Sequence, residues 1–249
     1  MTTTTEGAAS KLKRRAIRAL MRQGGHPRGI AGRLTGWVMA HRRSNRQRNR
    51  WAVSLLDVQP SDRVLEIGFG PGVAIAELAS RATRGQVYGI DHSTVMVGQA
   101  SRRNAAAIRA HRVLLAHASV EELSSFEDPL DAILAVNNVG FWPNPTERLR
   151  ELRRLLCPGG RIALVSQPRC PGANHHTTAR AAQQLQDLLT QAGFTQIRTE
   201  TLGLDPPVAV SWPTTRPTSR PDRRWVRCDW RGCRRAVPRL RGPSAAGRP

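Results

Sequence analysis

From residue 63 onward, short apolar runs alternate with stretches in which apolar residues recur every three or four positions. This alternation is typical of a parallel sheet covered by helices. The runs predict strands over residues 63–67, 86–90, 113–116, 131–136, 161–166, 196–201 and 207–210. The intervening periodicity predicts helices over 45–56, 73–81, 94–109, 145–156 and 178–192, with a short turn at 120–123. We therefore expect an α/β fold with a mostly parallel sheet and helices on both faces.

The two ends of the chain differ from this middle part. Arginines are scattered among the apolar residues of the first fifty positions, which predicts a basic helical extension over 1–50 that could act as a lid. After residue 212, Arg, Pro, Gly and Ala dominate and the apolar periodicity ends. Such a composition buries too little apolar surface to offset the entropy cost of ordering. We expect one main domain over 51–212 and a disordered tail over 213–249.

The net charge of +21 is concentrated at the ends. Residues 1–50 contribute +12 and residues 216–249 contribute +9, whereas residues 51–215 hold fifteen basic and fifteen acidic side chains. A neutral middle part gives no reason to expect a nucleic acid partner there. Because the predicted helix over 11–22 is basic, weak contact with an anionic membrane surface stays a possible interaction.

The cysteines and the apolar runs indicate the compartment. Cys157, Cys170, Cys228 and Cys233 have neither the spacing of a disulfide framework nor that of a zinc site, and we expect no bound metal. Neither a secretory signal nor an apolar run of about 18 residues is present. We expect a cytoplasmic protein with reduced thiols, and the sequence does not determine its oligomeric state.

The segment VLEIGFGPG, residues 64–72, combines a buried strand, a carboxylate and three alternating glycines. A turn without side chains lets a small polar ligand approach the backbone. A phosphate-binding P-loop is excluded, because Val73 and Ala74 stand where it needs Lys and Ser or Thr. The dinucleotide fingerprint fits poorly, since Val73 replaces its third glycine.

The same segment resembles the first motif of the class I S-adenosylmethionine-dependent methyltransferases. Glu66, Gly68, Gly70 and Gly72 match that motif position by position, and Asp91 supplies the acidic residue that ends the second strand in the family. The segments 131–145 and 155–165 resemble the later motifs of its small-molecule enzymes, including the ubiquinone/menaquinone-biosynthesis type. The resemblance covers about residues 45–210. It implies a Rossmann-like, seven-stranded sheet, S-adenosyl-L-methionine as cofactor and a small-molecule methyl acceptor.

The resemblance also implies roles for individual residues. Glu66 would organise the glycine loop or bind the amino group of the cofactor, and Asp91 would accept hydrogen bonds from the ribose hydroxyls. His92 would lie against the adenine. Ser119, followed by Val120, stands where the family often has an acid that binds the adenine, so that its hydroxyl or the Glu121 carboxylate would replace this contact.

Plainer interpretations of these residues stay open. Glu66 could cap loop amides, and Asp91 could cap the helix that follows it. Asn137, with Asn138, ends the fourth strand and could line the transfer pocket or form a turn. Phe141 and Trp142 could form walls of the acceptor site or pack under a helix. The segment around Asn137 lacks the Pro-Pro-aromatic sequence of amino-methylating DNA enzymes.

The sequence identifies no catalytic residue firmly. Methyl transfer from a sulfonium mainly requires alignment, so an acid–base pair is not needed. Where the acceptor must lose a proton, His175 and His176, in a loop after the fifth strand, are the candidate bases. Two other functions stay open: a non-catalytic S-adenosylmethionine-binding protein, and an RNA methyltransferase that binds through its basic ends.

Overall fold

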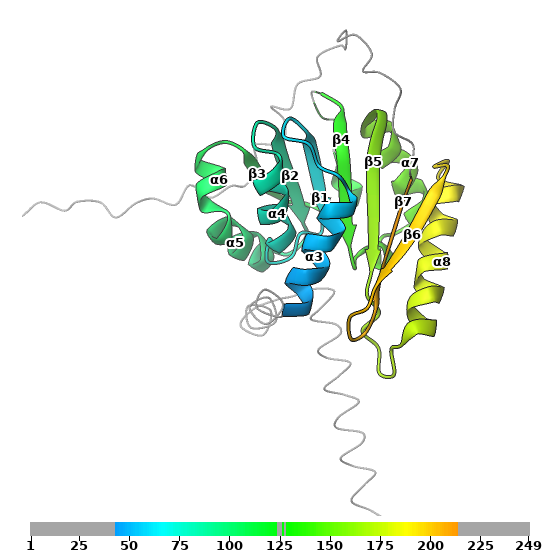
Figure 1. The fold of residues 1–249 in the computed structure, drawn as a ribbon. Helices are drawn as coiled ribbons and strands as arrows, with labels where there is room; N and C mark the ends of the chain where they lie inside the picture. The colour runs from blue at the N-terminus through cyan, green and yellow to red at the C-terminus, as the bar shows by residue number, and fades with distance from the viewer. Residues whose placement is uncertain (1–42, 124–125, 127, 214–249) are drawn as a thin grey trace, which may run out of the picture.

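The computed structural model describes residues 43–123, 126 and 128–213. In these residues the chain alternates between helices and strands (Figure 1). The helices are α3 (Arg43–Leu55), α4 (Val73–Arg81), α5 (Thr94–Arg103), α6 (Ala105–Arg109), η1 (Val120–Glu122), η2 (Val139–Phe141), α7 (Pro145–Leu155) and α8 (His175–Gln191). The strands are β1 (Arg63–Ile67), β2 (Gln86–Asp91), β3 (Val113–His117), β4 (Leu130–Val136), β5 (Leu156–Ser166), β6 (Ile197–Leu202) and β7 (Val208–Pro213).

The seven strands form one sheet in the order β3-β2-β1-β4-β5-β7-β6. Strands β1 to β5 are parallel, and β7 runs antiparallel between β5 and β6. The order reverses between β1 and β4, where open α/β sheets carry their ligands at the carboxyl ends of the strands. The expected Rossmann-like, mostly parallel sheet of seven strands is confirmed.

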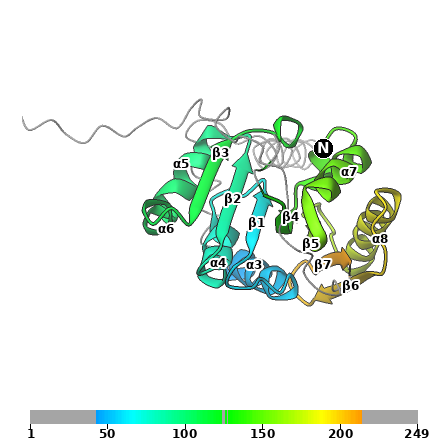
Figure 2. The ribbon, with the colours of Figure 1, turned by 90° about the horizontal axis from the view of Figure 1, so that it is seen from above.

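Helices cover both faces of the sheet. Helices α3, α4 and α5 lie over one face, and α7 and α8 over the other (Figure 2). Alternate residues of each central strand enter the two cores: Val64 packs with α3 and α4, whereas Leu65 belongs to the core on the α7 side. Burial on both faces explains why these strands are continuous apolar runs in the sequence.

Several predicted boundaries are wrong, and two of them have a clear physical cause. The helix expected over 94–109 is divided at Asn104, whose φ of −104° and ψ of 18° are not helical. The side-chain amide of Asn104 donates hydrogen bonds to backbone carbonyls. Short polar side chains that bond to the backbone in this way compete with the hydrogen bonds of a regular helix. Strand β5 begins at Leu156, five residues earlier than predicted, and its pairing with β4 shifts register between Leu130 and Ala132. The bulge at Pro158–Gly160 thus lies within the strand.

The expected border between extension and main domain falls inside helix α3, which crosses residue 50. Ala52 and Val53 of α3 are fully buried in the core. The rest of the expected extension, residues 1–42, and the tail after Pro213 lie outside the described residues. Among the helices that are described, none has both the length and the apolarity that crossing a bilayer requires.

Candidate functional site

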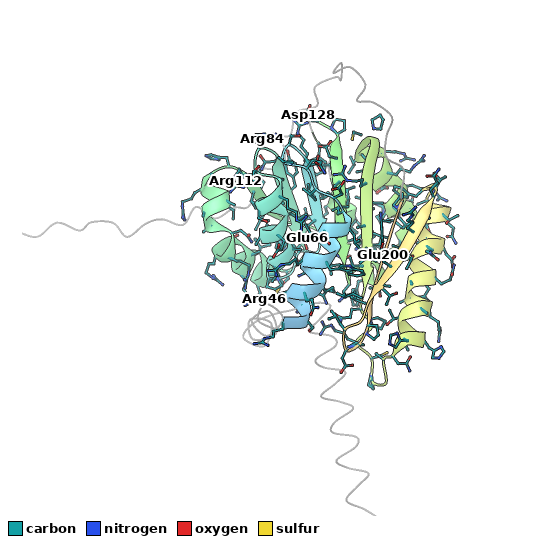
Figure 3. All side chains as sticks on the ribbon, viewed as in Figure 1. Arg46, Glu66, Arg84, Arg112, Asp128 and Glu200 are labelled. Carbon is teal, nitrogen blue, oxygen red and sulfur yellow. The ribbon has the colours of Figure 1, made fainter. Side chains whose placement is uncertain are left out.

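The predicted site residues from β1, β2 and β4 lie at the carboxyl ends of these parallel strands. Figure 3 shows Glu66, the fourth residue of β1, near helix α3. Arg84, Arg112 and Asp128, which precede β2, β3 and β4, lie together at the other edge of the sheet. The functional edge is therefore the one that the glycine loop after β1 shares with α3.

The three glycines of the loop all have positive φ but serve different purposes. A Cβ on Gly68 would collide with the Asn138 side chain, and one on Gly72 would lie 2.7 Å from the Cβ of Ala100. A Cβ on Gly70 would meet nothing within 4 Å. Space for a ligand is thus present at Gly70, whereas Gly68 and Gly72 permit close packing within the protein.

The loop is held from three sides. Asn138 donates a side-chain hydrogen bond to the Ile67 carbonyl, and Gly68 N donates to Ile90 O at 2.8 Å. From α5, Arg103 Nε donates to Pro71 O at 3.0 Å, and Asn104 Nδ2 donates to Gly72 O at 3.1 Å. The loop is therefore ordered by protein contacts before any ligand binds.

Asp91 joins the loop to the end of β2. Its Oδ2 accepts from Gly70 N at 2.8 Å and its Oδ1 accepts from Ser93 N at 2.9 Å. Burial raises the pKa of the Asp91 carboxyl, against the opposing effect of these amides. The N-cap of α5 is Ser93 and not Asp91, so the helix-cap interpretation of Asp91 is wrong. Each carboxylate oxygen still has a lone pair for a ligand hydroxyl.

Glu66 is 2% exposed and has one oxygen without a partner. The backbone amide of Ile75 hydrogen-bonds to the carboxyl group, while Oε2 has no hydrogen-bond partner. Burial and then the nearby Asp91 raise the pKa of Glu66 well above its ordinary value, and Arg48 opposes this shift. A buried polar atom without a partner costs about 1–3 kcal/mol, which a ligand that bonds to it would recover.

The residues expected at the adenine come from two segments: His92 follows Asp91 directly, and Ser119 follows Ala118, whose N donates to Asp91 O at 3.1 Å. His92 has an exposed side chain with its Nδ1 3.9 Å from Asp91 Oδ1. Ser119 and Glu122 form a capping box at η1, in which Ser119 N donates to Glu122 Oε2 at 2.7 Å. Val120 is buried in the core on the α7 side, which leaves its main-chain atoms for contact with a ligand.

Asn137, at the end of β4, has a positive φ of 56° and bonds across to β5. Its Oδ1 accepts from Gln167 N at 2.7 Å, so the side chain fixes the relative position of two strand ends. Trp142 is buried in the core, whereas Phe141 is 63% exposed and is the better candidate for a wall of the acceptor site.

His175 and His176 do not lie in a loop as expected. They are the first two residues of α8, which Asn174 caps by accepting from His176 N at 2.9 Å. Both histidines are exposed.

Sequence patterns did not identify a cluster formed by Arg48, Gln167 and Arg169. Arg48 comes from α3, and the other two follow β5, so 119 positions separate the hydrogen-bonded pair Arg48 and Gln167. No motif joins residues so far apart. The signal available was the position of Gln167 directly after a strand of the parallel sheet.

Comparisons with known proteins agree with this geometry. A family described as methyltransferase domain matches residues 64–160. The uncharacterized methyltransferase YdaC of Bacillus subtilis is 28% identical over 75% of this chain and 99% of its own length. The ubiquinone/menaquinone biosynthesis C-methyltransferase UbiE of Geotalea daltonii is 30% identical, and the 27-O-demethylrifamycin SV methyltransferase of Amycolatopsis mediterranei is 32% identical.

The last two matches cover 50% and 44% of this chain, and they span 54% and 40% of those relatives. Among solved structures, a putative S-adenosylmethionine-dependent methyltransferase from Methanococcus maripaludis has a TM-score of 0.57 at 17% identity, over 75% of this chain and 94% of its own. A methyltransferase of the same cofactor dependence from Aquifex aeolicus has a TM-score of 0.54 at 18% identity, over 66% and 87%. These structures share the fold described above.

Proposed function

We propose that the chain is a class I S-adenosylmethionine-dependent methyltransferase and that it methylates a small-molecule acceptor. The observation that carries the proposal is the open space at Gly70 beside two buried carboxyl groups, Glu66 and Asp91. The electrostatic influence of Asp91 on Glu66 indicates that the two groups lie close together.

These residues fit the cofactor S-adenosyl-L-methionine. Asp91 would accept hydrogen bonds from the ribose hydroxyls, each worth roughly 1.5–3 kcal/mol for a charged acceptor. Glu66 would use the free lone pairs of Oε2 to bind the amino group of the methionine end. Gly70, with no Cβ, would let the nucleoside approach the loop. His92 and the main chain at Ser119 and Val120 would border the adenine.

Methyl transfer requires alignment of the acceptor nucleophile with the methyl group and the leaving sulfur more than it requires acid–base catalysis. When bound, S-adenosylmethionine supplies a methyl group on a positively charged sulfur, which an acceptor nucleophile attacks in line with the leaving sulfur. Asn137 at the end of β4 and Phe141 in η2 would orient the reactants. For an acceptor that must lose a proton, His175 or His176 would serve as base.

The proposal of a small-molecule acceptor is supported by the relatives and by the charge of the chain. UbiE is named for ubiquinone and menaquinone biosynthesis, and the Amycolatopsis enzyme for a rifamycin. Residues 51–215 carry equal numbers of basic and acidic side chains. A neutral middle part favours small acceptors over RNA, which binds to basic surfaces.

Calorimetric titration with S-adenosylhomocysteine, the demethylated product of the cofactor, tests the cofactor site. We expect Asp91→Asn to weaken binding about 10- to 100-fold through the lost charge-assisted hydrogen bonds. Asp187→Asn is the matched control, because Asp187 is exposed on α8, where it accepts a hydrogen bond from Gln183. Equal affinity in Asp91→Asn and the wild type would overturn the assignment.

A second experiment tests transfer. The full chain is incubated with S-adenosylmethionine labelled in its methyl group and with extracts fractionated by molecular mass. Label in small-molecule fractions is the expected outcome. Label in RNA would support the RNA methyltransferase instead, and cofactor binding without label in any fraction would support a non-catalytic protein.

We also propose that the protein works in the cytoplasm. Cys157 and Cys170 are free thiols in the described part of the chain, and reduced cysteines are the rule in that compartment. Fractionation of cells that express the full chain, followed by immunodetection, tests this.

A further inference from the structure

Strand β6 forms one border of the sheet. Within the described residues it pairs with β7 and with no other strand, and Figures 1 and 2 show it beyond β7. An edge strand turns a row of backbone N–H and C=O groups outward, and these groups can pair with a further strand. The outer edge of β6 is therefore a candidate interaction surface.

Two exposed charges of opposite sign lie on β6, and Figure 3 labels one of them, Glu200. Ile197 packs into the core beneath α8, so Arg198 and Glu200 point to the opposite face, because side chains alternate along a strand. Their opposite residues in β7 are Trp212 and Val210, which carry no charge. Among the described residues, neither charge has an ion-pair partner.

A second copy of β6 complements this charge pattern. Opposite residues of two antiparallel strands point to the same face, so a two-fold axis between two copies passes between identical residues. With the axis at Thr199, Arg198 of each copy stands opposite Glu200 of the other. The Cβ atoms of directly opposite residues lie about 4.5–5.5 Å apart, which lets these side chains form two ion pairs.

The neighbouring registers lack this complementarity. With the axis at Glu200, two glutamates stand directly opposite each other, and with the axis at Arg198, two arginines do. Like charges in such positions are destabilising. With the axis at Thr201, only residues 200–202 of the strand overlap with the other copy. The charges of β6 therefore favour a single register for pairing with itself.

We propose that β6 pairs antiparallel with β6 of a second copy of this chain, about a two-fold axis at Thr199. The sheets of the two copies then join into one, and Arg198 and Glu200 form reciprocal ion pairs across the axis. This inference goes beyond the proposed function and does not depend on it. The competing explanation is that the two charges protect the edge from pairing, as charged side chains do on many edge strands.

Sedimentation equilibrium of the full chain tests the proposal. The salt concentration is about 0.15 M, at which screening over about 8 Å reduces the repulsion between two copies of net charge +21. We expect the wild type to form a dimer. Arg198→Glu places acidic groups opposite each other, and Glu200→Arg does the same with basic groups. Each variant should raise the dimer dissociation constant about tenfold or more.

A mixture of the two variants tests the register. In a mixed dimer about Thr199, both acidic positions of one chain stand opposite basic positions of the other. An equimolar mixture should therefore dimerise about as tightly as the wild type, and so should the double variant Arg198→Glu/Glu200→Arg. Arg109→Glu is the matched control, because Arg109 is an exposed arginine of α6, and it should leave dimerisation unchanged.

Three results would overturn the inference. A wild type that stays monomeric up to about 100 μM would identify Arg198 and Glu200 as protection of the edge. Single variants that dimerise like the wild type would place the interface on another surface. Weak dimerisation in both the mixture and the double variant would exclude the register at Thr199. If one single variant unfolds, as its melting curve would show, the other single variant and the double variant decide.

Discussion

At the scale of single residues, the motif predicts Glu66, Gly70 and Asp91 because strand ends and turns are determined by local sequence. Their contacts were less predictable. That Gly68 and Gly72 serve packing depends on Asn138, Ala100 and Asn104, which approach from elsewhere in the chain. The contact between Arg48 and Gln167 could not be predicted from the sequence, because a hydrogen bond across 119 positions leaves no periodic pattern.

Gly70→Ala should weaken S-adenosylhomocysteine binding at least tenfold, because its Cβ would enter the space left for the ligand. The matched control is Gly172→Ala: Gly172 also has positive φ and open space around its Cβ position. Both variants carry the same strain, about 1–2 kcal/mol for a left-handed residue. Calorimetry should show loss of binding in Gly70→Ala alone, and equal affinities in the two variants would contradict a ligand at Gly70.

Glu66→Gln should change how stability depends on pH. The folded state raises the pKa of Glu66, so it keeps a proton that the unfolded chain loses above the ordinary pKa of 4.5. The free energy of unfolding of the wild type should therefore fall as pH rises from there toward the raised pKa, by up to about 1.4 kcal/mol per pH unit for this group.

Urea unfolding of the ligand-free protein between about pH 5 and pH 7 measures this dependence. Glu66→Gln should show a smaller decrease than the wild type, whereas the exposed Glu200→Gln should match the wild type. An identical decrease in all three proteins would show that Glu66 does not keep its proton in the folded state.

At the scale of elements, the sequence predicted the order of all seven strands and of the longer helices between 45 and 210, since each has a strong apolar period, but it missed η2. The exceptions lie where side chains compete with regular structure. Asn104 divides one predicted helix through its side-chain bonds, and Pro158 to Gly160 lie in a bulge of β5 although Pro and Gly usually end an element. Such outcomes depend on tertiary partners that a local pattern does not contain.

Asn104→Ala should reduce both stability and cofactor affinity. The side chain donates to Ala100 O at 2.9 Å and to Gly72 O at 3.1 Å, so its loss removes two buried hydrogen bonds and releases the glycine loop. We expect a loss of about 1–3 kcal/mol in urea unfolding, together with weaker S-adenosylhomocysteine binding.

Asn174→Ala is the control for Asn104→Ala, because it removes the N-cap of α8 at a cost of about 1 kcal/mol away from the loop. It should reduce stability and leave cofactor affinity unchanged. If both variants bind the cofactor like the wild type, Asn104 does not position the loop.

At the scale of the whole molecule, helix α3 determines where the chain can be shortened. The sequence suggested a border at residue 50 because the excess of basic over acidic residues ends there, but Asn45, Arg48 and Asn49 are buried. The charge distribution did not reveal that α3 crosses this position, since a buried arginine looks the same in the sequence as an exposed one. A variant that lacks residues 1–42 retains all contacts described here, whereas one that lacks 1–50 loses the first eight residues of α3.

We therefore expect removal of 1–50 to lower the unfolding temperature well below that of the variant that lacks 1–42. Differential scanning calorimetry of both variants measures this difference. Equal unfolding temperatures would show that Asn45, Arg48 and Asn49 add nothing to the stability of the sheet.

The antiparallel strand β7 has a consequence for the order in which the protein can assemble during translation. Strand β6 reaches the sheet only by pairing with β7, which is made after it and inserts between β6 and β5 (Figure 1). The nascent chain therefore exposes the free edge of β5, and leaves β6 unpaired, until residue 213 has left the ribosome. The Pro206 carbonyl that anchors Gln167 lies in the same late segment. The hydrogen bond that holds Gln167 at the end of β5 is thus completed last, after the glycine loop and Asp91 have been made.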